Sequence, residues 1–154
     1  MRGTFLLTPW LHGVVYKSNQ NAINKTKSRL LASLVGSGKI DKAIIAALEG
    51  DSIWAASPNY NISPDELRII SEILLGSERE RDNAFADGLY VAGERFVLAR
   101  AEDRSIWACA GRSGIAIAKS KQAIIIGHYG ETSVASNAYS TVDALADYLI
   151  SVGY

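Results

Sequence analysis

The chain has 154 residues, of which 48% are hydrophobic, and its 16 basic and 16 acidic side chains give a net charge of zero. This length suits a single domain, and the hydrophobic share excludes an intrinsically disordered chain. The single cysteine, Cys109, excludes an internal disulfide and a multi-cysteine zinc site, and no apolar run approaches the roughly 18 residues of a transmembrane segment.

The charges are distributed unevenly. Residues 1–40 contain six basic and no acidic side chains, and residues 95–121 contain six basic side chains against two acidic ones. A basic patch on an otherwise acidic body indicates either an anionic partner, such as an acidic protein surface or anionic lipid, or a solvated surface without a partner. A nucleic-acid partner is not expected, because the net charge is zero and no strand carries an RNP-like aromatic motif.

The first 25 residues are poorly patterned. An apolar run over Thr4–Tyr16 is interrupted by Pro9, and no clear cleavage site follows it. The segment therefore has only a weak likeness to a signal or transit peptide. We expect residues 1–25 to be an atypical extension, either disordered or the product of a mis-assigned start, and residues 26–154 to form the folded domain.

The domain is predicted to open with a helix and a hairpin. Leu30, Leu31 and Leu34 have helical spacing within Thr26–Val35, and two glycines that follow directly end this helix. Two apolar runs come next, at Lys42–Leu48 and Ser52–Ser57. The Glu-Gly-Asp sequence between them is typical of a turn, which predicts a β-hairpin.

A second helix is predicted to begin after Ser63. This serine is followed directly by proline and, three residues on, by Glu66, which is the pattern of a capping box. The apolar face over Leu67–Leu74 extends the helix to Gly76. The polar stretch Ser77–Asp87 indicates a loop or a ragged helix.

The second half of the chain has the pattern of consecutive strands. Apolar segments separated by tight turns predict an antiparallel meander over the ranges 89–92, 94–101, 105–110, 114–119 and 122–129. An apolar face at helical spacing then predicts a last helix over Thr141–Val152. We therefore expect a single α+β domain in which helices pack on one antiparallel sheet.

The sequence offers no pattern typical of catalysis or metal binding. Two short glycine clusters lack the residues of a phosphate-binding loop. Cys109 and His128 have no local pattern that pairs them as nucleophile and base, and a lone strand cysteine is usually a small buried residue. Asp143 and Asp147 lie four residues apart, but without histidines or further acids they favour a solvated helix face over a metal site. We therefore expect no enzyme activity, metal or cofactor.

Three aromatic residues have positions typical of a binding surface. Trp54 follows the turn of the predicted hairpin, and Tyr148 and Tyr154 lie near the end of the last helix. Exposed aromatic rings bind proline-rich segments because their flat faces pack on the ridges of a polyproline II helix. The alternative, packing in the core, fits Tyr154 poorly because chain ends usually fray.

Five segments carry a resemblance to a known family by their order and spacing: residues 35–42 (VGSGKIDK), 51–57 (DSIWAAS), 100–107 (RAEDRSIW), 121–129 (KQAIIIGHY) and 146–154 (ADYLISVGY). Together they make the chain resemble profilins, most closely the fungal kind, over about four fifths of its length. The resemblance implies a central antiparallel sheet with the N- and C-terminal helices on one face and shorter helices on the other. It also implies a cytoplasmic protein of the cytoskeleton without a catalytic site.

The resemblance implies three kinds of partner: monomeric actin, proline-rich actin-assembly factors and phosphoinositide lipids. The residues that match the family's proline-binding positions are Trp54, Tyr148, Leu149 and Tyr154. Those that match or extend its basic actin-binding positions are Arg100, Arg104, Lys119 and Lys121. The same four residues, together with Arg112, are expected to bind phosphoinositides.

Two departures from the family pattern affect these expectations. The family carries a tryptophan and a tyrosine on the first helix, where this chain has Thr26 and Arg29, so we expect weakened proline binding. Ser140 stands where fungal relatives tend to have lysine, which predicts modestly weaker electrostatic attraction to actin. An alternative function is a phosphoinositide-dependent membrane-surface adaptor, or a scaffold domain of the same fold, that has lost actin binding.

Overall fold

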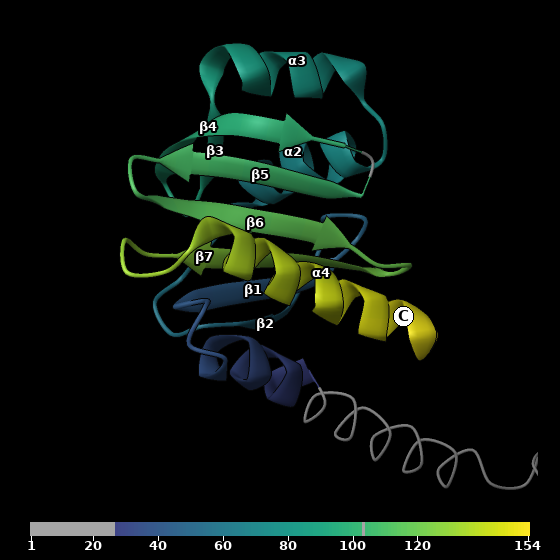
Figure 1. Ribbon diagram of the computed structural model, residues 1–154. Helices are drawn as coiled ribbons and strands as arrows, with labels where there is room; N and C mark the ends of the chain where they lie inside the picture. The colour runs from purple at the N-terminus through teal and green to yellow at the C-terminus, as the bar shows by residue number, and fades with distance from the viewer. Residues whose placement is uncertain (1–26, 103) are drawn as a thin grey trace, which may run out of the picture.

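A seven-stranded antiparallel sheet lies at the centre of the computed structural model, which describes residues 27–102 and 104–154 (Figure 1). Its strands are β1 (Lys42–Ala47), β2 (Ile53–Ala56), β3 (Leu89–Val91), β4 (Glu94–Ala101), β5 (Ser105–Ala110), β6 (Ser113–Lys119) and β7 (Ala123–Tyr129). Their order in space is β2-β1-β7-β6-β5-β4-β3. The first hairpin therefore pairs with the last strand of the meander.

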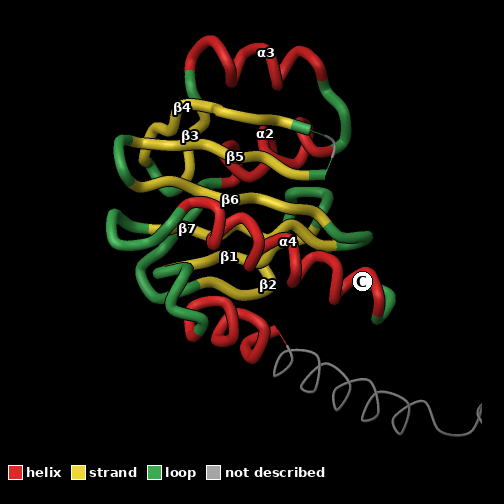
Figure 2. The backbone as a smooth tube through the Cα atoms, viewed as in Figure 1, coloured by secondary structure: helices red, strands yellow, loops and turns green. Residues whose placement is uncertain are grey.

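Helices cover both faces of this sheet (Figure 2). They are a helical segment over residues 27–36, α2 (Pro64–Leu74), α3 (Glu78–Asp87) and α4 (Ala135–Ser151). Segment 27–36 and α4 pack on one face, and α2 packs on the other. The shorter helix α3 lies against α2 and β4, near the edge of the sheet that β3 forms.

The sheet separates two hydrophobic cores. In β1, Ile44 and Ala46 are buried on the side of α2, whereas Ala43 and Ile45 are buried on the side of α4. This alternation arises because neighbouring side chains of a strand point to opposite faces. A strand covered on both faces needs apolar residues at every position, which explains the continuous apolar sequence of β1.

Helix α2 begins with the predicted capping box. The Ser63 hydroxyl accepts a hydrogen bond from the Glu66 amide (3.2 Å), and the Glu66 carboxylate accepts one from the Ser63 amide (2.8 Å). The same carboxylate also accepts from the amides of Ala92 (3.1 Å) and Gly93 (2.9 Å). Glu66 therefore ties the start of α2 to the turn between β3 and β4.

The predicted fold class is confirmed, and two element boundaries differ from the prediction. Residues 78–87 form the regular helix α3, because the Ser77 hydroxyl caps its first turn and Glu80 and Ala84 are buried. Helix α4 begins six residues before the predicted Thr141, since tertiary packing buries Ala138 where the local pattern is weak. The predicted extension 1–25 and Thr26 lie outside the described residues. Within the described ranges, no helix has the length and apolar character needed to cross a membrane.

Candidate interaction surfaces

An aromatic pair lies where β2 meets the end of α4. The rings of Trp54 and Tyr154 are in edge-to-face contact, with centroids 6.4 Å apart. The Tyr154 amide donates to the Leu149 carbonyl (2.8 Å), and the Tyr154 carbonyl accepts from the Gln122 amide and the Ser120 hydroxyl (both 2.7 Å). These bonds fix Tyr154 against Trp54, so the two rings form one surface.

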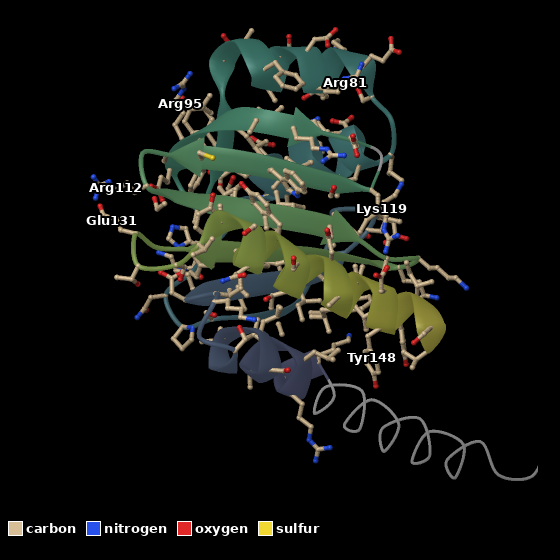
Figure 3. The ribbon with its side chains drawn as sticks, viewed as in Figure 1. Arg81, Arg95, Arg112, Lys119, Glu131 and Tyr148 are labelled. Carbon is tan, nitrogen blue, oxygen red and sulfur yellow. The ribbon has the colours of Figure 1, made fainter. Side chains whose placement is uncertain are left out.

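The other two residues matched to proline binding have different environments. Tyr148 is 54% exposed and projects from α4 on the side of segment 27–36 (Figure 3). Leu149 is only 2% exposed and packs in the core beneath α4. We use the name aromatic platform for Trp54, Tyr148 and Tyr154, which present their rings at the surface. Leu149 supports this platform from below.

A lysine occupies one face of the Trp54 ring. The Lys27 ammonium lies 4.4 Å from the ring centroid, at the distance of a cation–π contact. Lys27 is not among the binding residues predicted from the sequence. Helical spacing contained the signal, because Lys27, Leu30, Leu31 and Leu34 recur at the interval that puts residues on one helix face. Arg29, two residues on, is exposed.

A second surface lies on the half of the sheet that α4 leaves open. Helix α4 packs over β6 and β7, so β4 and β5 are uncovered on that side (Figure 1). The Arg100 guanidinium stacks over the Trp107 ring at 4.6 Å, and that ring stacks on Tyr139 of α4 at 4.2 Å. Val97 is 58% exposed and pairs with Cys109 of β5. We use the name open sheet face for these five residues.

Buried hydroxyls hold the α4 side of this face in place. The Tyr129 and Tyr139 hydroxyls are hydrogen-bonded to each other (3.3 Å), and the Cys109 sulfur lies 3.7 Å from the Tyr129 oxygen. Burial raises the pKa of both tyrosines. Both therefore stay neutral at physiological pH, and the pair orients Tyr139 against Trp107.

Acidic side chains neutralise part of the basic surface. Arg104 forms an ion pair with Asp147 of α4, and Arg100 forms one with Glu102 at 2.7 Å. Burial raises the pKa of Asp143, while Arg104 and then Arg100 act to lower it. The acids of α4 therefore face the basic residues of the meander.

In the part of the chain that the structure describes, no group of three or more potential ligand side chains could hold a metal.

The remaining basic residues do not form one patch with Arg100. The Lys119 ammonium donates to the Leu74 carbonyl (2.8 Å) at the end of α2, on the opposite face of the sheet. Lys119, Lys121 and Arg104 line a small pocket of about 250 Å³ at one end of β6. Arg112 lies at the other end of this strand, roughly 20 Å away (Figure 3). The predicted set is therefore divided over three places.

Comparisons with known proteins give a consistent result. The family model described as Profilin matches residues 25–154. A profilin of Schizosaccharomyces pombe is 40% identical over 122 residues, which are 79% of this chain and 93% of that protein. A profilin of Saccharomyces cerevisiae is also 40% identical over 122 residues, which are 79% of this chain and 94% of that protein. A crystal structure of the S. pombe profilin matches with a TM-score of 0.74 and 39% identity, over 80% of this chain and 94% of that one.

Two more distant structures share the fold. A mouse profilin IIa in complex with a double repeat of the mDia1 FH1 domain has a TM-score of 0.69, and covers 82% of this chain and 98% of that one. A LokiProfilin2 complex with rabbit actin has a TM-score of 0.65, and the match covers 81% of this chain and 96% of that one. Each is 18% identical to this chain, so each supports the fold alone.

Proposed function

The chain belongs to the profilin family, and on this premise we propose that it binds monomeric actin and regulates actin polymerisation. The family is non-enzymatic, so its action is one of binding. A protein that covers one face of an actin monomer blocks nucleation and sequesters monomers when it is in excess. A monomer that is carried to a proline-rich assembly factor is instead delivered to a filament end.

The observation that supports actin binding best is the open sheet face. It combines a cation held flat on Trp107 with the exposed apolar side chain of Val97. Interfaces with large buried areas favour aromatic and arginine anchors of this kind. Arg104, at the side of this face, adds a charge that attracts an acidic surface. The ion pairs with Asp147 and Glu102 would weaken this attraction without removing it, because exposed pairs are worth little in water.

A pull-down with monomeric actin tests this proposal. We expect the full-length chain to bind, and binding to weaken as salt rises, since screening shortens the range of surface charges. The variant Arg100→Glu/Arg104→Glu should lose binding while Arg112→Glu, at the far end of β6, retains it. Thermal unfolding of each variant controls for folding. Absence of binding by a folded wild-type chain would refute the proposal.

The aromatic platform supports a second activity, binding of proline-rich actin-assembly factors with reduced affinity. Trp54 and Tyr154 supply two rings in edge-to-face contact, but Lys27 covers one face of the Trp54 ring and Arg29 replaces an aromatic residue of the family pattern. Each lost aromatic anchor costs about 1 kcal/mol or more, which is about fivefold or more in affinity. Titration with a proline decamer should give weak binding that Trp54→Ala abolishes; affinity as high as that of the S. pombe profilin would refute the weakening.

Phosphoinositide binding is the third proposed activity, and the end of β6 supports it. Arg104, Lys119 and Lys121 line one pocket there, where they can surround a phosphate headgroup. Flotation with vesicles that contain phosphatidylinositol bisphosphate should recover the chain at low salt only, and Lys121→Glu should reduce recovery. Flotation without any actin binding would instead favour the membrane-surface adaptor.

A further inference from the structure

A groove of about 610 Å³ runs between segment 27–36 and α4. Leu30, Leu34 and Leu145 give it apolar walls, Tyr148 lies at one end, and Lys39 lies at the other. Tyr148 belongs to the aromatic platform as well, so the groove continues that platform along the two helices. We use the name interhelical groove for this feature.

The helical segment beside the interhelical groove is basic, and Asp41, the first acidic residue after it, is paired with His128 (2.6 Å). Residues 27–40 contain Lys27, Arg29 and Lys39 and no acidic residue. The acids of α4 lie on its other side, where Asp147 pairs with Arg104. The groove therefore has an apolar centre, a lysine at its far end and a second lysine on the tryptophan of the platform.

The acidic turn between β1 and β2 does not offset these charges. The Ser71 hydroxyl of α2 donates to the Leu48 carbonyl, which holds this turn against α2 on the opposite face of the sheet. Glu49 and Asp51 belong to that turn. The positive charge beside the aromatic platform is therefore available to a ligand.

We propose that this chain selects proline-rich segments that carry acidic residues beside the proline run. The inference rests on the proposed proline binding and names the class of partner for that same surface. The Lys27 ammonium covers one face of the Trp54 ring, so a proline that stacks on that face displaces it. A carboxylate in the ligand then gives the displaced ammonium a new partner. An acidic segment therefore offsets the loss of the contact between Lys27 and Trp54, whereas a neutral segment does not.

The spacing of the two lysines sets the length of such a segment. Lys39 comes twelve positions after Lys27, and the helix ends at residue 36, so nine helical steps at 1.5 Å and a short turn place the two backbone positions roughly 15 Å apart. A polyproline II helix rises about 3.1 Å per residue, so acids five or six residues apart can reach both lysines. The hydroxyls of Ser33 and Ser140 line the groove between them, where they can donate to peptide carbonyls that a polyproline II helix leaves free.

Three peptides test the proposal with the full-length chain. Each has ten prolines with a six-residue tail at both ends, and the first and last positions of each tail are both glutamate, both glutamine or both lysine. Calorimetric titration at low salt should give about fivefold tighter binding for the glutamate peptide than for the glutamine peptide, and weaker binding for the lysine peptide. The differences should disappear at about 0.5 M salt.

Variants assign the selectivity to the two lysines. Lys27→Gln and Lys39→Gln should each reduce the preference for glutamate, and the double variant should remove it while it still binds the glutamine peptide. Arg112→Gln removes one distant positive charge and should keep the full preference. Equal binding of the glutamate and glutamine peptides would overturn the inference and leave proline binding intact. Failure of all three peptides to bind would overturn both.

Discussion

The contrast between Tyr148 and Leu149 gives the sharpest test of how the aromatic platform is built. Leu149 is 2% exposed, and its replacement by alanine removes three buried carbon atoms. The transfer cost is about 2.4 kcal/mol, and the cavity that remains brings the total to about 3–4 kcal/mol. In a domain of this size the melting temperature should fall by about 6–16 °C. Tyr148→Ala removes a ring that is 54% exposed and should change stability by less than about 0.5 kcal/mol.

Thermal and urea unfolding, followed by circular dichroism, measure the stability of both variants, and titration with a proline decamer measures their binding. We expect Leu149→Ala to be much less stable and, below its melting temperature, to bind the peptide nearly as well as the wild type. We expect Tyr148→Ala to be stable and to bind at least fivefold more weakly, as an exposed aromatic anchor should. A stable Leu149→Ala, or equal losses of stability in the two variants, would refute this division of roles.

Three further predictions concern stability. Gly127→Ala would place a methyl group 2.8 Å from Val142 and 2.9 Å from Ile40, so urea unfolding should show a loss of about 1–3 kcal/mol, and an unchanged midpoint would contradict the close packing of α4 on β7. Ser63→Ala should cost about 1 kcal/mol through the lost cap of α2, whereas Ser37→Ala, outside a helix start, should cost less. Burial raises the pKa of Asp143 above its ordinary value of 3.8, so the native state binds this proton more tightly than the unfolded chain does. The stability that this gives is complete below pH 3.8 and is lost as the pH rises through the native pKa. Asp143→Asn should therefore raise the melting temperature at pH 7 and not below pH 3.8, and a lower melting temperature at pH 7 would show that its attraction to Arg100 and Arg104 outweighs burial.

Local signals were sufficient for most of the fold. The capping box at Ser63 depends on residues three positions apart, and the turns of the meander depend on glycines and charged residues between apolar runs. These interactions act within a few residues, so a single sequence contains them. The polar sequence of α3 fits either a loop or a ragged helix, because the burial of Glu80 and Ala84 depends on packing against other elements rather than on a strong apolar stripe.

The candidate surfaces were harder to predict because their contacts join distant parts of the chain. Arg104 and Asp147 are 43 residues apart, and nothing in the local pattern pairs them. Lys119 has the same strand parity as Ile115 and Ile117, which face α2. Because residues 115–118 are all apolar, the sequence alone does not show which face is which, so the prediction groups Lys119 with Arg100 although the sheet separates them. The positions of Trp54, Tyr148 and Tyr154 in the sequence indicate a binding surface and the family resemblance agrees, but the contact of Lys27 with Trp54 follows only from how segment 27–36 docks.

The most direct test of the central claim is hydrogen–deuterium exchange of the full-length chain with and without monomeric actin. If the open sheet face binds actin, amides of β4, β5 and the first turns of α4 should become protected, because these elements carry Val97, Arg100, Trp107 and Tyr139. Segment 27–36 and the β1–β2 hairpin should exchange as before, since they carry Trp54 and one wall of the interhelical groove and lie away from the open sheet face. Protection confined to these latter segments, or no protection under saturating actin, would contradict the account.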